Sequence, residues 1–233
     1  MFTVEENPNS LVSEAYKSLR TAIKYFSTDE EIKTIVVTSA LPSEGKTTIA
    51  GNLAITLSES GAAVLLVDCD LRNPSIHRNF NISNDIGLTS LLIEESTLKE
   101  TTKFIRPNLV FISTGEIPPN PSEILGSKSM SKFIDEMKKT VDYIIFDTPP
   151  VLPVTDAKIL AQSCDATILV TRANKSKEKS VVEAYEELKK IGVNVIGTIL
   201  NDSEERSKNK RYGYYGVESK KKGIFNKKKY KRV

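Results

Sequence analysis

The sequence contains no tryptophan, a single histidine and only two cysteines, and these shortages argue against several classes of protein. Cys69 and Cys164 lie far apart and form no CxxC pair, and with His77 they lack the ligand spacing of a zinc site. We therefore predict neither a disulfide framework nor a structural zinc ion. Both thiols are expected to be buried or to lie at strand ends in a reducing compartment.

Long apolar runs are also lacking. No stretch approaches the roughly 18 consecutive apolar residues that span a bilayer, and residues 1–10 lack the charged start and apolar core of a signal peptide. We expect a cytoplasmic protein, so any membrane role would need a partner or surface charge. Hydrophobic residues make up 39% of the chain, which is sufficient for a folded core.

Charge is distributed unevenly along the chain. Residues 203–233 contain twelve Lys or Arg and three Glu, a net charge of +9, which leaves −6 for residues 1–202 because the whole chain carries +3. The apolar pattern also ends after Asn201. We predict a globular domain over residues 1–202 and a flexible, basic, tyrosine-rich tail over residues 203–233.

Short apolar runs alternate with helix-length segments in the globular part. Helical patterns cover residues 10–26, 47–61, 128–140 and 176–191. The expected strands are TIVVTS (34–39), AVLLVD (63–68), NLVFIST (108–114), DYIIFD (142–147), ATILVT (166–171) and NVIGTIL (194–200). Their continuous apolarity indicates a mostly parallel sheet buried on both faces. The alternation predicts a doubly wound α/β domain that binds its ligand at the carboxyl ends of the strands.

A phosphate-binding loop follows the first expected strand. The run ALPSEGKT (40–47) has the Walker A spacing, with Ala40 in place of the first Gly, and it leads directly into a helix. In this P-loop NTPase-like arrangement Gly45 permits close approach, Lys46 reaches the β/γ oxygens and Thr47 ligates Mg²⁺. The residues predicted to contact ATP are Ser43, Glu44, Gly45, Lys46, Thr47 and Thr48.

Three acids end two further expected strands. Asp68 and Asp70 follow the run at 63–67, and Asp147 follows the run at 142–146. One Asp after a strand can be a turn former or a helix cap, but three acids beside a Walker loop indicate a Mg²⁺ site. We predict that Asp68 acts as the catalytic base, with Asp70 and Asp147 organising metal-bound water and Lys46 holding the phosphates.

The segments SALPSEGKTT, LLVDCDLR and IIFDTPP together resemble the Walker A, A′ and B motifs of the bacterial tyrosine kinases that act in capsule and exopolysaccharide synthesis. IPPNPSEIL (117–125) is similar to a loop of that family, and the chain most resembles the free-standing kinases of Gram-positive bacteria. The resemblance implies an ATP- and Mg²⁺-dependent protein-tyrosine kinase. It also implies autophosphorylation in trans on a C-terminal tyrosine cluster, and activation by the cytoplasmic segment of a transmembrane protein.

The resemblance also implies roles for further residues. The implied phosphoacceptors are Tyr212, Tyr214, Tyr215 and the more distant Tyr230. The family carries an ExxRxxR pattern that helps to form a ring of subunits, and here Glu14, Lys17 and Arg20 match it, with Lys17 in place of the middle Arg. Such a row of charges can equally be a solvated helix face. Asn201 lies where related ATPases place an adenine-contacting Asn, although a turn role is an alternative.

Two other functions remain open. A ParA/MinD-type ATPase shares the fold and the acids, but it uses a second, early lysine in its Walker loop, at the position of Leu41. In the other alternative, the basic tail binds anionic lipid or nucleic acid, because clustered Lys and Arg attract phosphate groups. Of these two partners we expect the membrane rather than nucleic acid, with phosphorylation of the tail weakening the contact.

Overall fold

The computed structural model describes residues 2–26 and 31–203. The predicted phosphoacceptor tyrosines and the basic tail from residue 204 lie outside the described residues. In this part of the chain the strands are β1 (Thr34–Ser39), β2 (Val64–Asp68), β3 (Thr102–Arg106), β4 (Leu109–Ile112), β5 (Tyr143–Asp147), β6 (Ala166–Arg172) and β7 (Val195–Asn201). They form one sheet of order β3-β4-β2-β5-β1-β6-β7.

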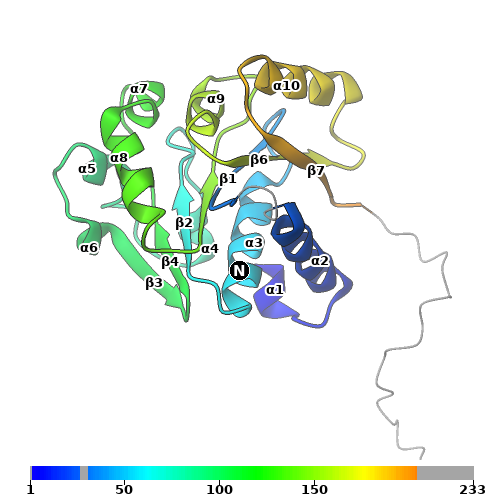
Figure 1. Ribbon diagram of the computed structural model, residues 1–233, viewed down its shortest axis with the longest axis horizontal. Helices are drawn as coiled ribbons and strands as arrows, with labels where there is room; N and C mark the ends of the chain where they lie inside the picture. Colours follow the sequence, from blue (N-terminus) through cyan, green and yellow to red (C-terminus); the bar gives the residue numbers. More distant parts are fainter. Residues whose placement is uncertain (1, 27–30, 204–233) are drawn as a thin grey trace, which may run out of the picture. The chain divides into compact units, whose positions relative to one another are not determined.

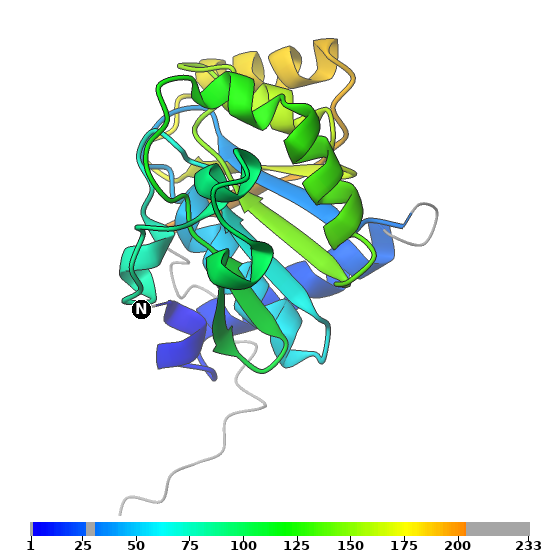
Figure 2. The ribbon, with the colours of Figure 1, turned by 90° about the vertical axis from the view of Figure 1, so that its left-hand side faces the viewer.

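Helices cover both faces of this sheet, as in a doubly wound α/β fold (Figure 1). They are α1 (Thr3–Glu6), α2 (Leu11–Phe26), α3 (Lys46–Glu59), α4 (Ile76–Asn79), α5 (Leu88–Leu92), α6 (Leu98–Thr101), α7 (Pro121–Leu125), α8 (Lys128–Met137), α9 (Asp156–Ala161) and α10 (Glu178–Lys190). Side chains of α1–α4 form a core on one face, and side chains of α5 and α7–α10 form a second core on the other. Figure 2 turns the side with α5–α8 toward the viewer.

The predicted parallel sheet is confirmed, and its register explains where the acids lie. Every residue of β1 and β2 is buried, as the continuous apolar runs predicted. Asp68 is the register partner of Asp147 on the neighbouring strand β5, and Val37 of β1 is the partner of Asp147 on the other side. The loop after β1 therefore meets both strand-end acids at one edge of the sheet.

One strand was not predicted from the sequence. β3 pairs antiparallel with β4 at the edge of the sheet, and its sequence TKFIR has no apolar run. The hairpin turns through Pro107 and Asn108, and Asn108 has a φ of 62°. Phe104 remains 72% exposed because an edge strand buries little of its outer face. Among the residues described, no helix combines the length and apolarity needed to cross a bilayer.

Candidate active site

The loop between β1 and α3 forms a phosphate-sized cradle. Ser43 and Gly45 have φ values of 62° and 102°, which turn the backbone sharply before α3 begins at Lys46. The first amides of a helix have no intrahelical partner and carry the positive end of its dipole, so they suit an anion. A cavity of about 290 Å³ opens here, lined by Ser43, Gly45, Lys46, Thr47, Asn73, Ser75 and Arg172.

Asp68 is completely buried at the end of β2 and is held by backbone amides. One carboxylate oxygen accepts from the N–H of Asp70 at 3.2 Å, and the other accepts from the N–H groups of Ser75 and Ile76 at 3.0 and 3.1 Å. Burial raises the pKa of Asp68 to about 6, while these hydrogen bonds limit the rise. The group is therefore mostly ionised at neutral pH.

Lys46 reaches across the cradle to the second acid of the A′ segment. Its Nζ donates to Asp70 Oδ2 at 2.9 Å, and both side chains are largely buried. Burial alone would lower the pKa of Lys46, but the nearby charges of Asp147 and Asp70 outweigh burial and raise that pKa. A permanently charged ammonium is thus held at the helix start, where phosphate oxygens are expected.

Asp147 is buried like Asp68, and neither of its carboxylate oxygens makes a hydrogen bond of standard geometry among the described residues; the Thr47 hydroxyl interacts with it more weakly. Burial raises its pKa to about 8, against the opposing charge of Lys46. A buried polar group without a partner is uncommon in folded proteins and points to a missing ligand. An ion or its bound water beside the P-loop would satisfy this carboxylate.

These residues fit a divalent ion that is shared with a phosphate group. Within the described part of the chain, no three or more acidic, His or Cys side chains form a ready-made metal site. P-loop proteins do not require one, because Mg²⁺ there is held by the loop hydroxyl, phosphate oxygens and water. The Thr47 hydroxyl lies 3.4 Å from that of Ser75, within the cavity lining.

Asn201, at the end of β7, lies directly against the P-loop. Its Nδ2 donates to the carbonyl oxygen of Glu44 at 3.1 Å, and a Cβ added to Gly45 would lie 1.9 Å from that nitrogen. The Glu44 carboxylate accepts from the Leu41 amide at 2.9 Å and from the Ser176 hydroxyl. Asn201 thus supports the loop backbone in this structure, and an adenine contact stays a prediction.

Arg172, at the carboxyl end of β6, was not predicted from the sequence as a site residue. Its side chain lines the phosphate cavity and donates to the carbonyl oxygen of Ser43 at 3.3 Å. It also pairs with Asp202 at 2.9 Å. The available signal was its position, because a basic residue that ends a parallel strand points toward the binding edge of the sheet.

The residues proposed for self-association are engaged within their own subunit. Lys17 pairs with Glu14 on α2 at 2.7 Å, and Arg20 donates to the carbonyl oxygen of Thr56 on α3 at 3.0 Å. Neither contact touches the phosphate cavity. The structure therefore shows an intrachain use for these side chains, and their part in a ring of subunits stays a prediction.

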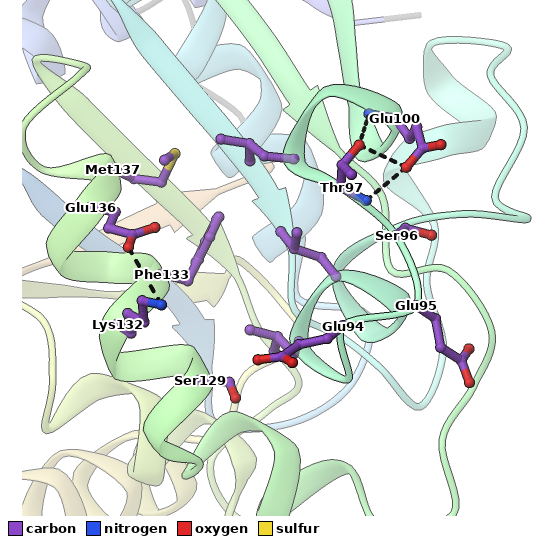
Figure 3. Close-up of a pocket in the computed structure, with 13 residues that line it drawn as sticks. Glu94, Glu95, Ser96, Thr97, Glu100, Ser129, Lys132, Phe133, Glu136 and Met137 are labelled. Carbon is purple, nitrogen blue, oxygen red and sulfur yellow. Dashed lines mark hydrogen bonds and ion pairs between the residues drawn. The ribbon is translucent and has the colours of Figure 1, made fainter.

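A second cavity, of about 340 Å³, opens between the α5–α6 segment and α8 (Figure 3). Two pairs of its lining residues already contact each other: Lys132 with Glu136, and Thr97 with Glu100. No part of the P-loop lines it, whereas four P-loop residues line the smaller cavity. The nucleotide is therefore predicted to bind at the smaller cavity.

Comparison with known proteins assigns the chain to a family. A family model named ParA and described as NUBPL iron-transfer P-loop NTPase matches residues 31–231, so the chain belongs to these P-loop NTPases. The tyrosine-protein kinase YwqD of Bacillus subtilis (strain 168) is 40% identical over 211 residues, which cover 90% of this chain and 89% of that protein. The tyrosine-protein kinase CpsD of Streptococcus agalactiae is 35% identical over 211 residues, which cover 89% of this chain and 91% of that protein. The chain is a bacterial tyrosine kinase.

A solved structure agrees with this family. The kinase domain of the Escherichia coli tyrosine kinase ETK matches with a TM-score of 0.85 and 32% identity, over 90% of this chain and 82% of that chain. Leu41, at the position where an early lysine is expected in ParA/MinD-type ATPases, is an aliphatic side chain packed against the core. Membership in the P-loop family implies a nucleotide together with a divalent metal ion.

Proposed function

We propose that this bacterial tyrosine kinase transfers the γ-phosphoryl group of ATP, with Mg²⁺, to tyrosines of its own C-terminal cluster and to other protein substrates. The observation that carries the proposal is the completely buried Asp147 carboxylate, which lies near Lys46 and the P-loop and makes no hydrogen bond of standard geometry among the described residues. A carboxylate left unsatisfied at this position supports a bound metal ion and the charge of a triphosphate.

Each residue of the cradle has a separate task in this proposal. The amides of residues 43–48 and the Lys46 ammonium would bind the β- and γ-phosphates. The residues that would hold Mg²⁺, directly or through water, are Thr47, Asp68, Asp70 and Asp147, and the ion would supply charge neutralisation. Arg172 lines the same cavity, so it would add a second cation near the phosphates.

Asp68 would accept the proton of the attacking tyrosine. The tyrosine oxygen forms the new bond to the γ-phosphorus, the bond to the bridging oxygen of ADP breaks, and the phenolic proton passes to the Asp68 carboxylate. A base with a pKa of about 6 is ionised at neutral pH, yet it can still hold the proton transiently. The acceptors proposed are Tyr212, Tyr214, Tyr215 and Tyr230, outside the described residues.

The cellular setting is also part of the proposal. Relatives named putative tyrosine-protein kinase CapB and putative tyrosine-protein kinase in cps region support a role in capsule or exopolysaccharide synthesis. The activator would be the cytoplasmic segment of a transmembrane protein, which would recruit this cytoplasmic kinase to the membrane. Self-association through Glu14, Lys17 and Arg20, and a peripheral contact of the basic tail with anionic lipid, belong to the same arrangement.

The deciding experiment maps phosphate by mass spectrometry after incubation with MgATP, with and without a candidate activator segment. Phosphotyrosine is expected on the tail of the wild-type chain and of Lys189→Met, a control on the outer helix α10. It should be absent from Lys46→Met. It should also be lost from the main cluster when Tyr212, Tyr214 and Tyr215 become Phe.

ATP hydrolysis without any phosphotyrosine, even with activator, would contradict the kinase proposal. That result would favour a ParA/MinD-type ATPase, the function that shares this fold.

A further inference from the structure

Three separate segments meet at one buried carboxylate beside the active site. Arg72, from the loop after β2, donates Nε and Nη2 to the two oxygens of Asp156 at 2.9 and 3.0 Å. Ser122, from α7, donates its hydroxyl to the same carboxylate at 2.7 Å. Fifty or more residues separate Arg72 from each of these partners in the sequence, so only the folded chain brings the three together.

The geometry is that of a rigid anchor rather than a surface ion pair. Asp156 is completely buried at the first position of α9, whereas the Arg72 side chain is 43% exposed. The two parallel N–H···O bonds fix the plane of the guanidinium as well as its position. The hydrogen bond to Asp156 is also the main reason why the pKa of Arg72 is raised.

The anchored arginine lies in the middle of the segment that holds both A′ acids. The N–H groups of Asp70, Ser75 and Ile76 bind the Asp68 carboxylate, and the N–H of Asn73 binds Asp70 Oδ1 at 3.1 Å. Arg72 is two residues from Asp70 and three from Ser75. Fixing Arg72 therefore restricts the backbone that positions the proposed base and its neighbour.

We propose that Asp156 and Ser122 are positioning residues, which act through Arg72 to hold the segment of residues 70–76, and with it Asp68 and Asp70, in the geometry needed for phosphoryl transfer. Neither residue touches the phosphate cavity, so their removal should impair the transfer step more than ATP binding. The inference rests on the proposed kinase function, because it assigns a task to residues that support that site.

The kinetic test uses full-length Asp156→Asn, Ser122→Ala and Arg72→Lys, with phosphorylation measured against a tyrosine peptide. For Asp156→Asn we expect kcat to fall about 10- to 100-fold, as for small displacements of catalytic groups, while KM for ATP stays within about threefold. Ser122→Ala should cause a smaller fall in kcat. Arg72→Lys should retain more activity than Arg72→Ala, since it keeps the charge but loses the fork.

A matched control lies on the same helix. Lys158 of α9 pairs with Glu187 of α10 at 2.7 Å, away from the cavity, so Glu187→Gln removes an ion pair from α9 without touching the anchor. Its kcat should equal that of the wild type. The double variant Arg72→Ala/Asp156→Asn should lose little more activity than Arg72→Ala alone, because both changes break one unit.

Hydrogen exchange tests the anchor without any catalytic activity. Amides in a peptide spanning residues 69–80 should exchange at least tenfold faster in Asp156→Asn and Arg72→Lys, whereas peptides from α10 should be unchanged. If kcat and exchange both match the wild type, or if KM for ATP rises while kcat stays constant, the inference is overturned. Absence of phosphotyrosine from the wild type would instead contradict the proposed function, and the exchange result would still decide the anchor.

Discussion

At the scale of single residues, hydrogen bonding separates two carboxylates that are equally buried. Asp68 accepts three backbone N–H bonds, whereas Asp147 accepts none from the described part of the chain. Their pKa values are accordingly raised to about 6 and about 8. When two neighbouring carboxyl groups have different pKa values because their surroundings differ, they can take different roles in a reaction. Here Asp68 is suited to act as a base, and Asp147 to ionise when a cation arrives.

The pKa of Asp68 predicts a pH profile. Because the base must be unprotonated, kcat/KM should rise about tenfold per pH unit below pH 6 and level off above it. Asp68→Asn should reduce kcat/KM at every pH and remove the rise. Steady-state assays between pH 5 and pH 8 would measure this. An unchanged profile in Asp68→Asn would exclude Asp68 as the base.

Asp147 predicts an effect on stability in the absence of ligand. The native carboxyl keeps its proton up to about pH 8, while the unfolded chain releases it near about pH 4. Its contribution to stability is therefore complete below pH 4 and is lost as pH rises to 8. Asp147→Asn removes this loss, so its Tm should exceed that of the wild type by an amount that grows from pH 5 to pH 8.

Thermal unfolding at several pH values gives this comparison, with Asp135→Asn on the exposed face of α8 as control. The Tm difference between Asp135→Asn and the wild type should not grow from pH 5 to pH 8. A Tm difference for Asp147→Asn that stays constant or reverses between pH 5 and pH 8 would contradict the assignment. Nucleotide with Mg²⁺ should stabilise the wild type more than this variant, since the bound ion favours the ionised carboxylate.

At the scale of elements, the end of β7 closes against the start of α3. Gly45 and Gly61 both have positive φ, 102° and 90°, but only at Gly45 would a Cβ meet another side chain, that of Asn201. An alanine in this region of backbone space costs roughly 1–2 kcal/mol by itself. The two glycines therefore separate backbone strain from the contact between β7 and the P-loop.

We expect both Gly45→Ala and Gly61→Ala to lower Tm, and only Gly45→Ala to abolish nucleotide binding. The added methyl group would displace Asn201 from Glu44 and so disturb the loop backbone that is expected to bind phosphate. Titration calorimetry with MgATP would measure the affinities. Equal affinity of the two variants for nucleotide would show that the Gly45–Asn201 contact does not shape the site.

At the scale of the whole molecule, the net charges of −6 on residues 1–202 and +9 on residues 203–233 favour encounters between copies. A chain that ends at Ser203 should therefore fold and phosphorylate the tail of full-length Lys46→Met. Mass spectrometry of the mixture would detect this. The Lys46→Met form of the short chain is the control, and phosphotyrosine that arises only when site and tail share one chain would exclude transfer in trans.

The sequence by itself determined the fold class, the P-loop and the three strand-end acids. These features follow from local patterns and from the rule that parallel strands bring their carboxyl ends together. The predicted helices at 10–26, 47–61, 128–140 and 176–191 are confirmed as α2, α3, α8 and α10, with ends that differ by up to three residues. Long amphipathic segments are predictable because their own residues supply the signal.

Only the tertiary structure decided how the site is supported and tuned. Several features depend on partners far away in the sequence. They are the edge strand β3, the short helices α4–α7 and α9, and the positions of Arg172 and Asn201. The anchor of Arg72 on Asp156 is of the same kind. The different pKa values of Asp68 and Asp147 arise because one loop folds its amides over the first carboxylate and none over the second, a packing that no local pattern records.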